Sequence, residues 1–88
     1  MNRVTVLLST YNGERYLREQ LDSVLEQQNV QINILVRDDG SSDNTINILK
    51  QYDAKFTNFR YYKNENLGPA RSFLDLICNA PDTDYYAF

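Results

Sequence analysis

Histidine and tryptophan are absent from this 88-residue sequence, and cysteine occurs once, as Cys78. Without histidine, the chain cannot supply a Ser-His-Asp triad, a histidine general base or a histidine-ligated zinc site. A single cysteine excludes an internal disulfide and fits a reducing compartment, so we expect a cytoplasmic location. Many hydrolase and metalloenzyme classes are therefore excluded at the outset.

Positive charge and long apolar runs are also scarce. The sequence has nine basic and twelve acidic residues, a net charge of −3. This charge argues against a nucleic acid partner, because binding to phosphates requires a basic surface. The N-terminal apolar run is too short for a signal peptide, and no stretch reaches transmembrane length. The glycine-rich phosphate motifs G-x-G-x-x-G and G-x-x-x-x-G-K-[ST] are missing as well.

The apolar residues that are present alternate between strand and helix patterns. Residues 4–8 form a nearly continuous apolar run, typical of a strand buried on both faces. Residues 14–28 then carry leucine and valine at helical spacing, at Leu17, Leu21, Val24 and Leu25. The same alternation continues with strands at 32–36, 59–62 and 84–88, and with a second helix through Ile46, Leu49 and Tyr52 that has N-cap candidates at Ser41, Ser42 and Asp43.

A third helix is expected to begin at Pro69, which suits a first helical turn. Its apolar face is predicted to consist of Ala70, Phe73, Leu74, Ile77 and Cys78. Strand and helix thus alternate along residues 1–88, which predicts one α/β unit with a parallel, Rossmann-like βαβαβαβ sheet. Since the sequence stops inside the last strand, we expect a truncated domain; the alternative is a compact protein whose last strand finishes the sheet.

Two loops follow the first two predicted strands, and ligands of parallel α/β sheets bind at the carboxyl ends of strands. In the first loop, S-T-Y-N-G, Tyr11 could stack on a base, and the hydroxyl of Ser9 or Thr10, with loop amides, could hold the ribose or the base edge. In the second loop, D-D-G-S-S-D, Asp39, or else Asp38, could accept the N3–H of a pyrimidine. Together the loops predict a pyrimidine nucleotide site.

Plainer interpretations of both loops stay open. Tyr11 could cover the core above a simple Asn-Gly turn, and Asp43 could be only a helix N-cap. Asp38 and Asp39 could also bind a metal, but neighbours on an extended segment point in opposite directions, which makes them poor co-ligands. A third segment, N-L-G-P-A-R, combines Gly68, a helix N-terminus and Arg71, which suits a pyrophosphate or plain helix initiation.

The stretches VTVLLSTYNGERYLREQLDSVLEQ, ILVRDDGSSDNTINIL and NENLGPARS resemble, in order and spacing, the N-terminal half of the family 2 inverting glycosyltransferases. These have a GT-A fold and include bacterial polysaccharide and rhamnosyl transferases. The resemblance implies half of a site for a UDP- or dTDP-sugar, in a parent enzyme that transfers the sugar to a saccharide or lipid-linked acceptor in cell-surface polysaccharide synthesis. The nucleotide-binding residues it implies are Ser9, Thr10, Tyr11, Asp38, Asp39, Gly68 and Arg71.

The resemblance also implies what these residues lack. The D-x-D motif that holds Mg²⁺ or Mn²⁺, and the catalytic base, would both come after Phe88, so we assign no catalytic residue and no metal ligand in this sequence. Asp82 and Asp84 have D-x-D spacing but precede the last strand instead of following it. We therefore expect residues 1–88 alone to have no transferase activity. The resemblance is also compatible with a location of the parent protein at the inner face of the cell membrane.

Two rival classes remain. A non-catalytic nucleotide-binding or receiver-like regulatory domain would also carry an acidic pair after a strand, although receiver domains place that pair after the first strand. A structural module is the other rival, because unpaired sheet edges recruit further chains. For the isolated chain we accordingly expect self-association through an exposed sheet edge.

Overall fold

The structure, a computed structural model, describes residues 3–26, 31–80 and 85–87. Its elements are, in chain order, β1 (Arg3–Thr10), α1 (Leu17–Leu25), β2 (Gln31–Asp38), α2 (Thr45–Lys55), β3 (Phe59–Lys63), α3 (Pro69–Asn79) and β4 (Tyr85–Ala87). All strand pairs are parallel, and the sheet order is β3-β2-β1-β4. The predicted α/β class and βαβαβαβ alternation are confirmed.

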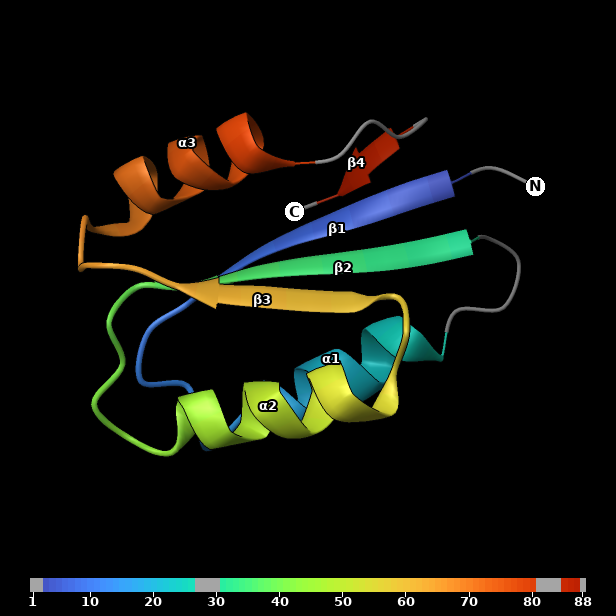
Figure 1. The fold of residues 1–88 in the computed structure, drawn as a ribbon, viewed down its shortest axis with the longest axis horizontal. Helices are drawn as coiled ribbons and strands as arrows, with labels where there is room; N and C mark the ends of the chain where they lie inside the picture. Colours follow the sequence, from blue (N-terminus) through green and yellow to red (C-terminus); the bar gives the residue numbers. More distant parts are fainter. Residues whose placement is uncertain (1–2, 27–30, 81–84, 88) are drawn as a thin grey trace.

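The helices cover the two faces of the sheet unequally. α1 and α2 lie on one face and α3 lies on the other (Figure 1). The chain first winds from β1 outward to β3, and then returns through α3 to place β4 on the other side of β1. This reversal of direction beside β1 is the point at which doubly wound sheets bind ligands, outside the carboxyl ends of the strands.

The face toward α1 and α2 carries the apolar core. Leu17 and Leu21 are fully buried there, and Val24 and Leu25 pack against them at the edge, as the helical spacing predicted. The buried cluster consists of Val6, Leu17, Leu21, Ile34, Val36, Ile48, Leu49, Tyr52 and Phe59. Since burial of apolar surface is the main driving force for folding, this face supplies most of the stability.

The face toward α3 is more polar, and there the sequence prediction is wrong. The inward residues of α3 are Ser72 and Leu76, both with no exposed area, whereas Leu74 is 62% and Ile77 51% exposed. The predicted apolar face, which also included the exposed Ala70 and Cys78, therefore points largely outward. The physical reason is Arg37 of β2, a buried guanidinium that requires hydroxyl and carboxylate partners from the helix above it.

Helix starts also differ from the prediction. The first helix was expected from residue 14, but α1 begins at Leu17, because the Gly13 carbonyl accepts the amides of Tyr16 and Leu17 in a turn. α2 begins at Thr45, whose amide donates to the Asp43 carboxylate at 3.0 Å. The predicted end of the first helix falls outside the described residues, as do Asp82, Asp84 and Phe88.

Across the described part of the chain, α1, α2 and α3 are each too short or too polar to cross a membrane.

The orientation of α3 is testable by truncating one inward and one outward leucine. Leu76→Ala removes a fully buried side chain and is expected to lower the free energy of unfolding by about 2–5 kcal/mol. Leu74→Ala, two residues away on the exposed side, is the matched control and should change it by less than about 0.5 kcal/mol. Urea unfolding of the two variants measures both; a larger loss for Leu74→Ala would show that the helix faces the other way.

Candidate functional site

The first two loops begin side by side because β1 and β2 pair along their whole lengths. Thr10, the last residue of β1, lies opposite Asp38, the last residue of β2. The Thr10 hydroxyl donates to Asp38 Oδ1 at 2.9 Å, and the Asp39 amide donates to the Thr10 carbonyl at 2.8 Å. The two loops therefore leave the sheet at one point.

Beyond that point the loops are bonded to each other. The amides of Asn12 and Gly13 donate to Ser41 Oγ at 2.8 Å and to Thr45 Oγ1 at 2.9 Å. In return, the Ser42 amide donates to Asn12 Oδ1 at 2.8 Å. Of the loop amides that could bind a ligand, those of Asn12 and Gly13 are therefore occupied by side chains of the second loop.

Asp38 is fully buried and accepts four hydrogen bonds. They come from the hydroxyls of Thr10 and Ser41 and from the amides of Gly40 and Ser41, at 2.6–3.2 Å. These donors fill the acceptor capacity of a carboxylate. Asp38 thus ties both loops together, and it has no free oxygen for Mg²⁺ or a phosphoryl group, which argues against the receiver-like alternative.

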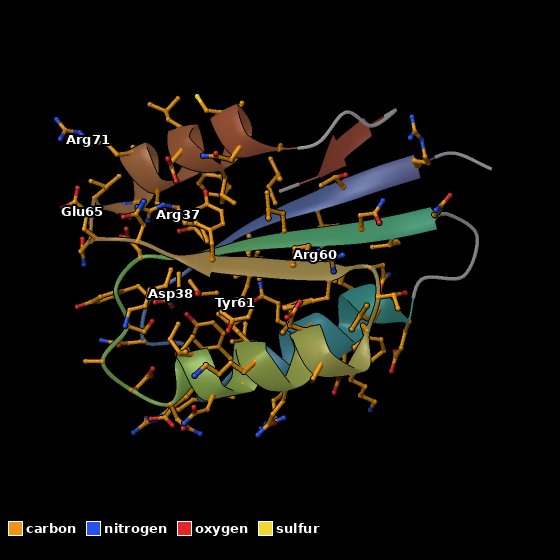
Figure 2. The ribbon with its side chains drawn as sticks, viewed as in Figure 1. Arg37, Asp38, Arg60, Tyr61, Glu65 and Arg71 are labelled. Carbon is orange, nitrogen blue, oxygen red and sulfur yellow. The ribbon has the colours of Figure 1, made fainter. Side chains whose placement is uncertain are left out.

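Asp39 faces the opposite side of the sheet from Asp38. Figure 2 shows Asp38 on the side of α2 and Arg37 on the side of α3, and Asp39 Oδ1 accepts from Arg37 Nη1 at 2.5 Å. The acidic pair diverges as expected. Within residues 3–26, 31–80 and 85–87, no group of three or more His, Cys, Asp or Glu could hold a metal ion.

Asp39 also accepts the backbone amides of the loop before α3. The amide of Leu67 donates to Oδ1 at 2.9 Å and that of Gly68 to Oδ2 at 3.2 Å. Burial acts to raise the pKa of Asp39, but the Leu67 amide, the Arg37 guanidinium and the Gly68 amide outweigh it and hold the pKa below its usual range. The carboxylate is therefore ionised and acts only as an acceptor.

Two glycines permit this arrangement of loops. Gly40 and Gly68 have φ values of +85° and +84°, a region that other residues rarely adopt. A Cβ on Gly40 would also lie 3.4 Å from the Asn66 amide nitrogen. A Cβ at that distance would make only ordinary van der Waals contact, so the positive φ values, and not a lack of space, favour glycine at both positions.

A hollow of about 440 Å³ opens where the three loops meet at the carboxyl ends of β1 and β2. It is lined by Ser9, Tyr11, Tyr16, Asp39, Asn66, Gly68, Pro69 and Phe73. Its size falls within the range of small-molecule sites. Aromatic rings, one carboxylate and a helix N-terminus surround a single space, which suits a planar polar ring joined to an anionic group.

The structure brings together four of the predicted nucleotide residues and leaves three aside. Ser9, Tyr11, Asp39 and Gly68 line the hollow. Thr10 and Asp38 are buried and bonded to each other behind it. Arg71 is exposed on the first turn of α3, where its side chain points away from the sheet (Figure 2).

Sequence reasoning missed Tyr16 and Phe73 as lining residues. Tyr16 packs over Gly13, so closely that a Cβ there would lie 3.1 Å from the ring. An aromatic five residues after Tyr11, in a turn with a glycine, was the signal that could have indicated it. Phe73 was assigned to an apolar helix face; its true place depends on the rotation of α3, which the periodicity does not reveal.

A second hollow, of about 420 Å³, lies near the amino end of β3, where Asn58, Arg60 and Asn79 contribute to its lining. Thr5 also lines it, and its buried hydroxyl has no hydrogen-bond partner within the described residues. Parallel sheets bind ligands at the carboxyl ends of their strands, so the hollow beside Asp39 is the candidate site.

Comparison with known proteins agrees with this geometry. The family model for Glycosyl transferase family 2 matches residues 5–88. The dTDP-rhamnosyl transferase RfbG of Shigella flexneri is 36% identical over 86 residues, which cover 92% of this chain and 30% of RfbG. Glycosyltransferase GlyA of Streptococcus pneumoniae is 37% identical over 67 residues, 76% of this chain and 10% of GlyA. The chain thus spans less than a third of either relative.

Solved structures match the fold closely. TarS 1–349 of S. aureus in complex with UDP-GlcNAc superposes with a TM-score of 0.79 and 29% identity, over 90% of this chain and 24% of the TarS 1–349 chain. The mannosyltransferase PcManGT of Pyrobaculum calidifontis, solved with GDP-Man and Mn²⁺, gives a TM-score of 0.75 at 25% identity, over 91% of this chain and 25% of its own. Both structures contain a nucleotide sugar, UDP-GlcNAc in TarS and GDP-Man in PcManGT.

The ion pairs beside the site predict a dependence of stability on pH. Asp75 of α3 accepts from Tyr62 Oη at 2.7 Å and from Arg37 Nε at 2.9 Å, and these bonds lower its pKa. Ionised Asp75 therefore stabilises the fold above about pH 4, the usual aspartate pKa, and this contribution disappears as the pH falls through the lowered value. Asp75→Asn should lower the melting temperature at neutral pH, and its difference from the unmodified chain should shrink in acid.

Thermal unfolding followed by circular dichroism across this pH range measures that difference. Asp53→Asn, on an exposed position of α2, is the matched control and should change little at any pH. A difference for Asp75→Asn that stays constant into strong acid would contradict the ionic role of Asp75.

Proposed function

This chain belongs to glycosyl transferase family 2, and on that premise we propose that it forms the nucleotide half of a site for a UDP- or dTDP-sugar. The observation that carries the proposal is the hollow at the carboxyl ends of β1 and β2. It gathers Tyr11, Asp39 and Gly68 from three separate loops, and each supplies a chemistry that a nucleoside diphosphate needs.

The base is proposed to bind among the aromatic side chains of the hollow. Tyr11 and Tyr16 are more than half exposed beside it, and Phe73 lines it from α3. Aromatic rings stack on any base, whereas the ionised Asp39 favours one that carries a donor at N3, as uracil and thymine do. RfbG is a dTDP-rhamnosyl transferase and TarS was solved with UDP-GlcNAc, which supports either pyrimidine, whereas PcManGT was solved with a purine nucleotide sugar, GDP-Man.

The diphosphate is proposed to lie at the N-terminus of α3. The first hydrogen bond of this helix runs from the Ser72 amide to the Gly68 carbonyl at 2.9 Å. The amides of Ala70 and Arg71 precede it and have no acceptor within the helix, and such amides, with the helix dipole, favour anions. The Arg71 side chain is close enough in sequence to turn toward the same group.

The activity of the whole protein is proposed by the same reasoning. The parent enzyme would transfer the sugar to a saccharide or lipid-linked acceptor in bacterial cell-surface polysaccharide synthesis, in the cytoplasm or at the inner membrane face. A divalent cation, Mg²⁺ or Mn²⁺, would neutralise the leaving diphosphate, as the Mn²⁺ in the PcManGT structure suggests. Residues 1–88 are proposed to lack transferase activity on their own. The open edge of β3 would favour self-association.

Nucleotide binding can be tested on the chain itself. Amide NMR spectra titrated with UDP, dTDP and ADP should show shifts that gather at Tyr11, Asp39 and Gly68, with both pyrimidines preferred. Tyr11→Ala should weaken UDP binding by about 5- to 150-fold, which corresponds to the loss of one stacked base. Leu74→Ala, on the exposed side of α3, should leave the affinity unchanged. Equal affinity for ADP, or shifts confined to the hollow beside Thr5, would refute the proposed site.

A further inference from the structure

Arg37 is a charged side chain with no exposed area, on the α3 side of β2. Its guanidinium donates to four groups. Nε donates to Asp75 Oδ2 at 2.9 Å, Nη1 to Asp39 Oδ1 at 2.5 Å and to Ser72 Oγ at 3.1 Å, and Nη2 to the Glu65 carbonyl at 3.0 Å. Arg37 thus joins α3, the β3–α3 loop and the second loop, D-D-G-S-S-D, which follows β2. Figure 2 shows Arg37 near Glu65, between the sheet and α3.

The two carboxylates hold Arg37 from opposite ends. Asp75 is itself fixed by the hydroxyl of Tyr62, at 2.7 Å. Burial, and then the bond to Asp75, raises the pKa of Tyr62 to about 12, so the phenol stays protonated and donates. Because the guanidinium is planar with its donors in fixed directions, a carboxylate fixed on one side sets the direction of the donors on the other.

Asp39 keeps one acceptor position for a ligand. A carboxylate can accept about four hydrogen bonds, and three are taken: Arg37 and the Leu67 amide on Oδ1, and the Gly68 amide on Oδ2. The remaining position is on Oδ2. Asp39 is almost fully buried yet lines the hollow, so a donor that reaches it must come from the hollow.

We propose that Arg37 is a positioning residue for nucleotide selection. It locks Asp39 Oδ1, so that Oδ2 accepts the N3–H of a uracil or thymine base, and Asp75 holds Arg37 in turn. This inference rests on the proposed nucleotide site and adds a residue that the comparison with other proteins does not assign. The hydroxyl of Ser72 extends the same lock to Ser9 on β1, at 2.5 Å.

The proposal concerns selection between bases. A purely structural role of Arg37 would not change that selection. Uracil carries a donor at N3, whereas cytosine carries an acceptor there, which a fixed carboxylate repels. If Arg37 only supported the fold, its loss would weaken UDP and CDP binding alike. If Arg37 aims Asp39, its loss should reduce the preference for UDP over CDP.

The test is the ratio of the CDP and UDP dissociation constants, measured by NMR titration on the 88-residue chain. The unmodified chain should prefer UDP by about 10-fold or more, as expected for a hydrogen bond to a charged acceptor. Arg37→Met should bring the ratio close to one, and Arg37→Lys should retain part of it. Arg60→Met is the matched control: Arg60 lies on β3 beside the other hollow, and its loss should leave the ratio unchanged.

Each outcome has a distinct meaning. If the unmodified chain binds no pyrimidine nucleotide, the proposed function fails, and this inference fails with it. If it prefers UDP and Arg37→Met keeps the full preference, only the role of Arg37 is overturned. Should Arg37→Met not fold, Asp75→Ala decides, because it removes one acceptor of Arg37 at a partly exposed position; an unchanged ratio there also overturns the proposal.

Discussion

A buried guanidinium must be surrounded by hydrogen-bond acceptors, because the free energy cost of an unpaired buried charge far exceeds the stabilisation that most single contacts provide. Arg37 imposes this requirement on the α3 side of the sheet. Ser72 and Asp75 face inward to meet it, and the Glu65 carbonyl and Asp39 complete the shell. The rotation of α3, the course of the loop before it and the orientation of Asp39 all follow from one side chain.

The fold could be predicted from the sequence wherever apolar burial decides it. The strands and the faces of α1 and α2 agree with the periodicity because they enclose an ordinary apolar core, with Leu17 and Leu49 as typical members. The periodicity of α3 is equally regular, yet Leu74 and Ile77 face outward. Hydrophobic spacing assumes that the sheet offers an apolar surface, and on this side Arg37 offers a polar one.

The site could be predicted in its residue types but not in its bonding. Strand ends on a parallel sheet bring Ser9, Tyr11 and Asp39 into one region, so motif position was sufficient to find them. Three-dimensional contacts decide which of these groups form hydrogen bonds within the protein. The amides of Asn12 and Gly13 and all four acceptor positions of Asp38 prove to be internal, and no spacing in the sequence distinguishes them from groups that await a ligand.

The cross-bonding of the first two loops has a consequence for molecular recognition. Since the Asn12 amide donates to Ser41 Oγ and the Ser42 amide donates to Asn12 Oδ1, the two loops are bonded to each other in both directions and form one continuous wall. A ligand therefore meets a preorganised surface and gives up little binding free energy to order it. In such a wall the backbone provides the shape of the site and the projecting side chains provide its selectivity. Those side chains can be exchanged to suit another base, while the backbone beneath them stays the same.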